Sequence, residues 1–185
     1  MKHPSQQIVT GPDILQKAEE LYENHASRLE KYMDLLLDWN EKINLVSRNV
    51  SRETLKQHII HSLLPVHMGL LQRHNRWIDA GSGGGLPGIP LAICEKEKTW
   101  ILNDNVRKKM RVVDDIIRSM KIDNCRVAPK SISLIDVRPG TGIVTKHAFK
   151  IPKLLHLLDK KPWKTVILWK GERDILPELS KTPGK

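Results

Sequence analysis

The stretch from Ile78 to Leu91, Ile-Asp-Ala-Gly-Ser-Gly-Gly-Gly-Leu-Pro-Gly-Ile-Pro-Leu, constrains the fold of this chain more than any other feature. Apolar residues end a short strand before Asp79, and the glycines that follow permit a tight turn because they lack a Cβ. Pro87 and Pro90 suit the first turn of a helix, where a missing N–H costs little. The pattern predicts a strand, a glycine turn and a helix start, where bare backbone and free amide groups can meet a cofactor.

The acids around this turn indicate which cofactor it holds. Asp79 lies two residues before Gly81, and the resulting pattern Asp-x-Gly-x-Gly-x-Gly favours S-adenosylmethionine over a nicotinamide dinucleotide. Asp104 ends the next predicted strand, about twenty residues beyond the last glycine, where an acid can hydrogen-bond ribose hydroxyls. A dinucleotide site uses a similar acid, and Asp104 could instead cap the helix that starts near Val106. Asp79 could contact the methionine part of the cofactor or bond the amides of the turn.

Basic residues gather in the second half of the chain. Residues 99–185 hold 19 Lys and Arg against 9 Asp and Glu, which accounts for the whole net charge of +10. A basic face beside a cofactor site suggests a polyanion such as nucleic acid, although a small protein can also be basic for solubility alone.

The two cysteines lie far apart and outside metal-ligand spacing, as expected of reduced thiols in a protein without a metal. The sequence has no apolar run long enough to span a bilayer and no secretory signal segment, so we expect a cytoplasmic protein.

The periodicity of apolar residues divides the chain into a helical part and an alternating part. Helical patterns start at Thr10-Gly11-Pro12-Asp13, cover about 26–39, and follow the cap Ser51, so residues 1–72 are predicted to form a helical subdomain. Residues 73–185 alternate, with strands near 76–80, 99–103, 124–128, 142–146 and 165–169 and helices near 88–96, 106–120 and 150–159. Pro129 and Pro139 leave little room for a full helix between the third and fourth strands. The alternation predicts a single α/β domain with a parallel, Rossmann-like sheet.

Five short motifs occur in order along nearly the whole chain. They are Trp39-Asn40-Glu41-Lys42-Ile43-Asn44-Leu45-Val46, His58-Ile59-Ile60-His61-Ser62-Leu63, the loop from Asp79 to Leu91, Asp104-Asn105-Val106-Arg107-Lys108-Lys109, and Leu168-Trp169-Lys170-Gly171. In this combination the chain resembles the bacterial 16S ribosomal RNA guanine-N7 methyltransferases, the glucose-inhibited division protein B family. That family continues into two more strands, and the 14 residues from Glu172 to Lys185 are too few to supply them, so we expect the C-terminal strands to be missing.

The glycine turn and the resemblance together predict the residues of the cofactor site. The expected contacts to S-adenosylmethionine are Asp79, Gly81, Ser82, Gly83, Gly85, Leu86, Asp104, Ile132, Ser133 and His147. His147 stands where the family has an arginine, which makes it the one candidate catalytic residue, although it could equally be an exposed strand end. The residues expected to meet RNA phosphates are Arg107, Lys108, Lys109, Lys146, Lys150 and Lys153, although a run of charges at a helix start is usually just solvated.

The resemblance implies methyl transfer from S-adenosylmethionine to guanine N7 in 16S rRNA, with the 30S subunit as partner and the enzyme as a monomer. Guanine N7 has a free lone pair, so holding it in line with the methyl sulfonium can supply catalysis without a general base. The alternative is a degenerate member that binds RNA or cofactor with little or no methyl transfer. It rests on departures at His61, Ser131–Ser133 and His147, and on the C-terminal strands expected to be missing.

Overall fold

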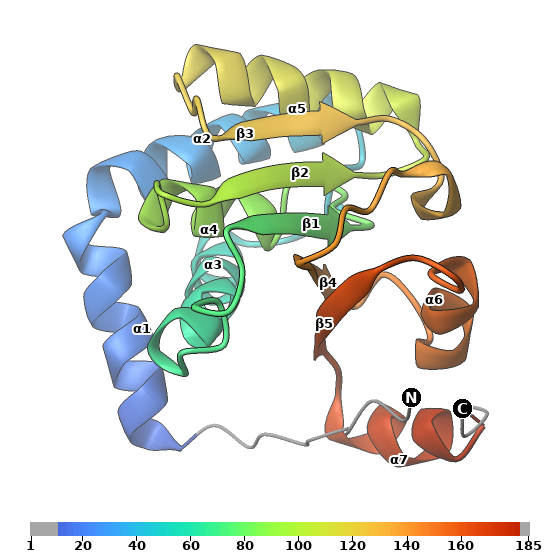
Figure 1. Ribbon diagram of the computed structural model, residues 1–185. Helices are drawn as coiled ribbons and strands as arrows, with labels where there is room; N and C mark the ends of the chain where they lie inside the picture. The colour runs from blue at the N-terminus through green and yellow to red at the C-terminus, as the bar shows by residue number, and fades with distance from the viewer. Residues whose placement is uncertain (1–10, 182–185) are drawn as a thin grey trace.

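The computed structural model describes residues 11–181, in which three helices precede a sheet whose strands alternate with helices (Figure 1). The first helices are α1 (Pro12–Asn24), α2 (Ala26–Lys42) and α3 (Arg52–His67). The Ser51 side chain accepts a hydrogen bond from Thr54 N at 3.1 Å, which confirms the predicted cap of α3. Gly11 precedes α1, whereas Thr10 of the predicted start lies outside the described residues.

Five parallel strands form one sheet in the order β3-β2-β1-β4-β5. Their bounds are β1 (Arg76–Ala80), β2 (Thr99–Asn103), β3 (Cys125–Ala128), β4 (Thr141–Lys146) and β5 (Trp163–Trp169). The five predicted strands and the parallel Rossmann-like sheet are therefore confirmed. The order reverses at β1, which pairs with β2 on one side and β4 on the other. In doubly wound sheets, ligands bind outside the carboxyl ends of the strands at such a point.

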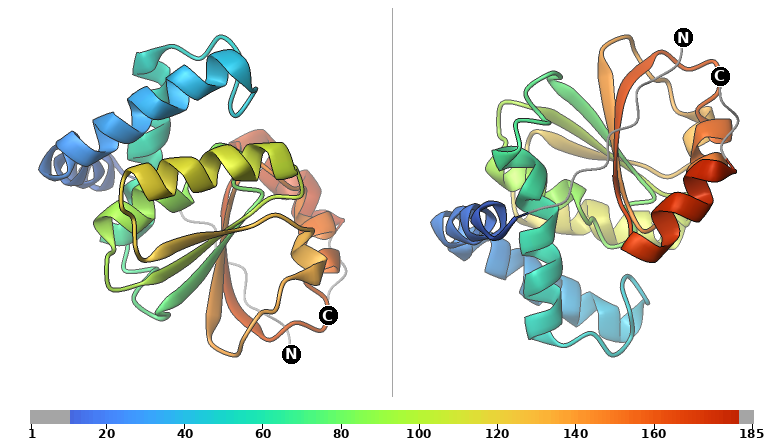
Figure 2. Two further views of the ribbon diagram at one scale, coloured as in Figure 1. Left: turned by 90° about the horizontal axis from the view of Figure 1, so that it is seen from above. Right: turned by 90° about the horizontal axis from the view of Figure 1, so that it is seen from below.

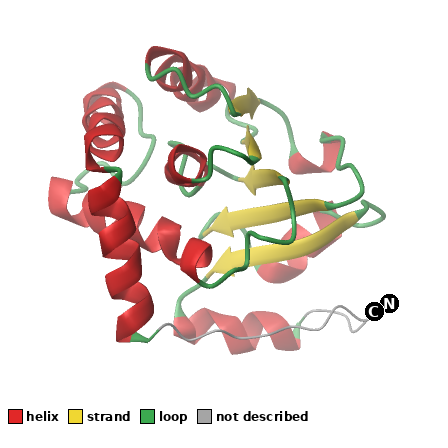
Figure 3. Ribbon diagram, turned by 60° about the vertical axis from the view of Figure 1, so that its left-hand side comes forward, coloured by secondary structure: helices red, strands yellow, loops and turns green. Residues whose placement is uncertain are grey.

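Helices cover both faces of this sheet (Figures 2 and 3). Helices α4 (Gly88–Cys94) and α5 (Arg107–Ser119) pack on one face together with the N-terminal helices. Helix α6 (Ile151–Leu157) and a short 3₁₀ turn (Ile132–Leu134) cover the other face. This turn is all the helical structure between β3 and β4, as the two prolines predicted.

The N-terminal helices share one hydrophobic core with the sheet. Tyr22 and Leu36 from these helices belong to the same buried cluster as Trp77, Trp100 and Val113 of the α/β part. The rings of Trp77 and Trp100 stack with centroids 6.0 Å apart, so both residues are core residues. The division of the single domain into a helical subdomain and a cofactor-binding core near residue 72 stays a prediction.

Helix α7 (Glu172–Ser180) was not expected from the sequence. It packs beside α6, and Glu178 Oε2 accepts a hydrogen bond from Ile151 N, the first residue of α6, at 2.7 Å. Pro177 inside the helix hides its pattern, because proline usually ends a helix. No helix in the described part of the chain is long and apolar enough to cross a membrane.

Candidate cofactor site

A hollow of about 210 Å³ lies at the carboxyl ends of β1 and β4, the point where the strand order reverses. Its lining comes from three places: the glycine turn after β1, the loop after α2, and the end of β4 together with α3. The lining residues are Leu45, Val46, Ser47, Val50, His58, Gly81, Ser82, Gly83, Gly84, Leu86, Lys146 and His147. The predicted glycine turn and the predicted His147 therefore meet in one cavity. We call it the cofactor hollow.

The amide groups of the glycine turn are bound to the protein itself. Gly81 N and Ser82 N both donate to Asn103 O, at 2.7 and 3.0 Å. Gly83 N donates to Asp104 Oδ2 at 3.1 Å. These amides of the turn are therefore not free for a ligand, because the end of β2 supplies acceptors that a local sequence pattern does not show.

Asp79 occupies the start of α4. Its side chain is fully buried, and Oδ2 accepts a hydrogen bond from Gly88 N, the first residue of the helix, at 2.8 Å. The sequence allowed Asp79 either to contact the methionine part of the cofactor or to hold the shape of the loop, and this hydrogen bond corresponds to the second role. Burial raises the pKa of Asp79 to about 8, and the charge of Asp104 adds to this rise. The hydrogen bond from Gly88 and the charge of Lys146 oppose it. The prediction of free amides at the helix start is thus wrong at Gly88, whose N–H already donates to Asp79.

Asp104 joins the glycine turn to the next helix. Its Oδ1 accepts a hydrogen bond from Val106 N at 2.9 Å, which is the capping role considered for it. Its Oδ2 bonds Gly83 N, a contact that the sequence did not predict. Each carboxylate oxygen has a further lone pair, so ribose contact stays a prediction.

Gly81 and Gly83 are glycines for a structural reason. Both have a positive φ, +72° and +54°, which residues with a Cβ rarely adopt. A Cβ on Gly81 would collide with Ala148, and one on Gly83 would lie 3.2 Å from Leu45 O. The turn thus packs directly against the loop after α2 and the segment after β4.

One buried side chain, that of Asn40, fastens the loop that forms a wall of the hollow. Its Oδ1 accepts hydrogen bonds from Leu45 N at 2.8 Å and Val46 N at 3.0 Å, and its Nδ2 donates to Ser47 O at 3.0 Å. In the sequence this asparagine stood out only as part of a family motif, and its role in the wall was missed. Asparagine near a helix end is a signal for such side-chain to backbone bonds.

Three histidines and a lysine gather beside the hollow. Lys146 Nζ donates to His58 O at 3.2 Å, and burial lowers the pKa of Lys146 to about 8, opposed by Asp79. Burial, followed by the nearby Lys146 charge, also lowers the pKa values of His58, His61 and His147 from 6.5. At neutral pH the lysine is therefore mostly charged while the histidines are neutral. His147 itself follows β4 with a φ of +55° and an exposed side chain.

The other predicted residues lie elsewhere. Ile132 is buried in the second core cluster, and the exposed Ser133 is bonded to Ser131, so these two and Gly85 are not among the described residues that line the hollow. Arg107, Lys108, Lys150 and Lys153 are exposed and Lys109 is half-buried. Lys146 instead lines the hollow. Contacts of these six side chains with RNA stay predictions. Among the described residues, no cluster of His, Cys, Asp or Glu is arranged to hold a metal ion.

The fold is that of a class of methyltransferases. It is similar to a putative methyltransferase, YhhF, from Escherichia coli, with 14% identity and a TM-score of 0.50 over 65% of this chain and 71% of that one. It is also similar to coclaurine N-methyltransferase bound to N-methylheliamine and SAH, with 13% identity and a TM-score of 0.53 over 85% and 58%. At such identities the likeness concerns the fold alone.

The chain belongs to the rRNA small subunit methyltransferase G family, whose family model matches residues 25–179. The family resemblance drawn from the motifs is thereby confirmed. The ribosomal RNA small subunit methyltransferase G of Christiangramia forsetii is 40% identical over 104 residues, 56% of this chain and 49% of that protein. That of Chlorobium phaeobacteroides is 32% identical over 146 residues, 78% and 66%. The chain spans about half to two thirds of the length of these relatives.

Proposed function

We propose that this protein binds S-adenosylmethionine in the cofactor hollow and methylates guanine N7 in 16S rRNA of the small ribosomal subunit. Membership of the family supports the reaction and the substrate. The observation that carries the choice of cofactor is the hydrogen bond from Gly88 N to Asp79 Oδ2. A dinucleotide places its pyrophosphate on free amides at a helix start, and here a carboxyl group already occupies that place. S-adenosylmethionine has no phosphate to place there.

The residues of the hollow divide the work of holding this cofactor. Gly81 and Gly83 let the turn pack closely against Ala148 and the carbonyl group of Leu45, which shapes the hollow, since neither carries a Cβ. Asp79 and Asp104 fix the turn, and we assign the remaining lone pairs of Asp104 to the ribose hydroxyls. The neutral histidines keep further positive charge away from a cationic ligand.

When bound, S-adenosylmethionine supplies the methyl group on a positively charged sulfur. The protein's part is to hold guanine N7 in line with that methyl group, which can lower the barrier without a proton acceptor. This assignment fits a site whose lysine is anchored to a backbone carbonyl and is mostly protonated at neutral pH.

Cations flank the same edge of the sheet as the hollow. Helix α5 starts after β2 and carries Arg107, Lys108 and Lys109, and helix α6 starts after β4 beside Lys150 and Lys153. We propose that these residues meet RNA phosphates while the target base enters the hollow, with Lys146 acting inside it. We further propose that the protein works as a monomer in the cytoplasm, which sedimentation and cell fractionation can test.

Calorimetric titration with S-adenosylmethionine, S-adenosylhomocysteine and NAD tests the cofactor. Binding of the first two without NAD is expected, whereas binding of NAD alone would overturn the assignment. Methyl transfer to undermethylated 30S subunits then tests the reaction. Cofactor binding without transfer would instead support a degenerate member that binds but does not methylate.

A further inference from the structure

A second hollow, also of about 210 Å³, lies at the opposite edge of the sheet, where β1, β2 and β3 begin. Three arginines line it: Arg76, Arg126 and Arg138. We call it the arginine hollow. The length of β1 separates it from the cofactor hollow, about 13 Å at the usual rise of a strand.

The register of the sheet brings these arginines together. Arg76 lies two residues before Ile78 in β1, and Arg126 pairs with Ile101 of β2. Ile78 and Ile101 belong to the same core cluster, so both arginines project to that face of the sheet. Arg138 comes from the segment that covers this face, in which Val137 is buried in the same cluster.

The positive charge of the hollow is poorly balanced by the protein. Arg76 Nε is buried and has no hydrogen-bond partner in the described part of the chain. Burial, then Arg138 and Arg126, lower the pKa of Arg76, and only Asp136 opposes them. The ion pair of Arg138 with Asp136 spans 3.8 Å between exposed side chains, so it contributes little. Asp123 also lines the hollow, as its one acidic residue among those described.

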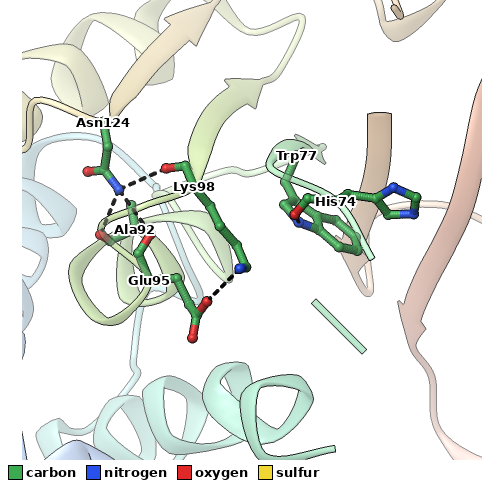
Figure 4. Close-up of polar contacts among 6 residues, drawn as sticks. All are labelled: His74, Trp77, Ala92, Glu95, Lys98 and Asn124. Carbon is green, nitrogen blue, oxygen red and sulfur yellow. Dashed lines mark hydrogen bonds and ion pairs between the residues drawn. The ribbon is translucent and has the colours of Figure 1, made fainter. Parts of the chain in front are cut away.

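One residue that lines the arginine hollow, Asn124, is held in place by three hydrogen bonds (Figure 4). Asn124 Nδ2 donates to Ala92 O, Glu95 O and Lys98 O at 3.0, 3.2 and 3.1 Å. The Asn124 side of the hollow is therefore fixed before a ligand binds, which lowers the entropy lost on binding there.

We propose that the arginine hollow binds a phosphate group. A guanidinium presents two parallel N–H donors that match a pair of phosphate oxygens, and an oxyanion would supply both the missing acceptor for Arg76 and the missing negative charge. The phosphate can come from the backbone of bound RNA or from a free phosphate compound. If RNA supplies the phosphate, the RNA-binding surface extends to the edge of the sheet where the strands begin. Only this RNA-binding case rests on the proposed function.

The test uses the full chain with Arg126→Gln/Arg138→Gln, two exposed positions. Lys17→Gln/Lys31→Gln is the matched control, because it removes the same charge from exposed sites in α1 and α2. Titration calorimetry with inorganic phosphate is expected to show saturable binding to the parent protein. Binding to Arg126→Gln/Arg138→Gln should be at least about tenfold weaker, because two guanidinium groups with paired N–H donors are lost. The control should bind as the parent does. Arg126→Lys/Arg138→Lys keeps the charge but not the paired N–H donors of the guanidinium groups, and it should bind phosphate with intermediate affinity.

A second arm measures binding of transcribed 16S rRNA against salt. If RNA supplies the phosphate, the slope of log affinity against log salt should be smaller by about one in Arg126→Gln/Arg138→Gln than in the control Lys17→Gln/Lys31→Gln. Loss of phosphate binding with an unchanged RNA slope would assign the site to a free phosphate compound. The proposal is overturned if the parent protein binds no phosphate, or if Arg126→Gln/Arg138→Gln binds phosphate and RNA as Lys17→Gln/Lys31→Gln does. S-adenosylmethionine titration of each variant verifies the fold and reports separately on the proposed function.

Discussion

Asp79 Oδ2 and Gly88 N lie 2.8 Å apart, so a buried carboxyl group at the end of β1 closes the start of α4. The carboxyl group contributes an acceptor where many nucleotide folds offer donors to a phosphate. Its pKa is raised because burial disfavours the charged form. The same contact therefore links the choice of cofactor to the pH dependence of stability.

Replacement of Asp79 by asparagine should flatten the fall in stability with rising pH. The pKa of Asp79 is about 8 in the folded protein and about 3.8 in the unfolded chain, so the folded state binds more protons between these values. Stability contributed by the protonated form is lost as pH rises through this window, with a slope of up to about 1.4 kcal/mol per pH unit. Urea unfolding measured between about pH 5 and pH 7.5 checks this.

The exposed Asp115→Asn serves as control for this experiment and should leave the slope of the parent protein unchanged. Lys146 has a folded pKa lowered to about 8 from 10.5, so its own effect, a rise in stability with pH, lies above this window. Equal slopes for the parent and Asp79→Asn would show that the carboxyl group ionises normally.

Gly83→Ala should weaken cofactor binding beyond its effect on stability, and Gly83→Val should abolish it. The added Cβ strains a backbone with φ +54° and lies 3.2 Å from Leu45 O in the wall of the hollow. Gly69→Ala is the matched control, since Gly69 has φ +65° and a Cβ there would meet no atom of the described residues within 4 Å. Both alanine variants should lose about 1–2 kcal/mol from backbone strain, but only the first should bind S-adenosylmethionine more weakly. Equal cofactor affinities in calorimetry would place the cofactor elsewhere.

Asn40→Ala should loosen the wall of the cofactor hollow. It leaves Leu45 N, Val46 N and Ser47 O without their partner. The loss of the buried bond to Leu45 N alone should cost about 1–3 kcal/mol, and the two part-buried bonds should add less. Asn40→Asp keeps the acceptor for the two amides and should recover most of the stability and the cofactor affinity. Urea unfolding and S-adenosylmethionine titration of the two variants check this. An alanine variant as stable as the parent would show that the loop does not depend on Asn40.

His147→Arg should raise the rate of methyl transfer at pH 7 and above if this position acts through its charge. Burial and the Lys146 charge lower the pKa of His147, so the histidine loses its proton before neutrality, whereas arginine stays charged. Single-turnover transfer to undermethylated 30S subunits across roughly pH 6 to 9 measures the effect. His67→Arg, at the exposed end of α3, is the control. Rates that match the parent at every pH would assign no catalytic part to His147.

Charge reversal at Lys108, Lys109, Lys150 and Lys153 should flatten the salt dependence of rRNA binding. For every lysine that no longer neutralises a phosphate, the slope of log affinity against log salt should fall by about one. Reversal of four exposed acids on the N-terminal helices, Glu19, Glu20, Glu30 and Asp38 to lysine, should not flatten it. An affinity of the parent protein that hardly changes with salt would exclude this face as the RNA surface.

The sequence predicted the sheet well because each strand is a short apolar run between turn signals, as in Trp77-Ile78 and Trp100-Ile101-Leu102. Helix α7 escaped prediction because Pro177 interrupts its pattern. Both the correct prediction of the strands and the failure to predict α7 follow from local sequence patterns.

The site was predicted only where it is local. The glycine turn and His147 follow their strands directly, and both line the hollow. The wall made by Leu45 and Val46 depends on Asn40 and on the packing of the loop against Gly83, which no periodicity encodes. The occupied amides of the glycine turn likewise depend on a neighbouring strand, through the carbonyl group of Asn103. Tertiary contacts of this kind decide which backbone groups stay free for a ligand.

Transfer of a labelled methyl group from S-adenosylmethionine to undermethylated 30S subunits tests the central claim most directly. We predict label in 16S rRNA as 7-methylguanine, with no transfer by Gly83→Val and normal transfer by the control Gly69→Ala. Binding of S-adenosylmethionine with no label in 16S rRNA, under conditions where both the parent protein and Gly69→Ala are folded, would contradict it.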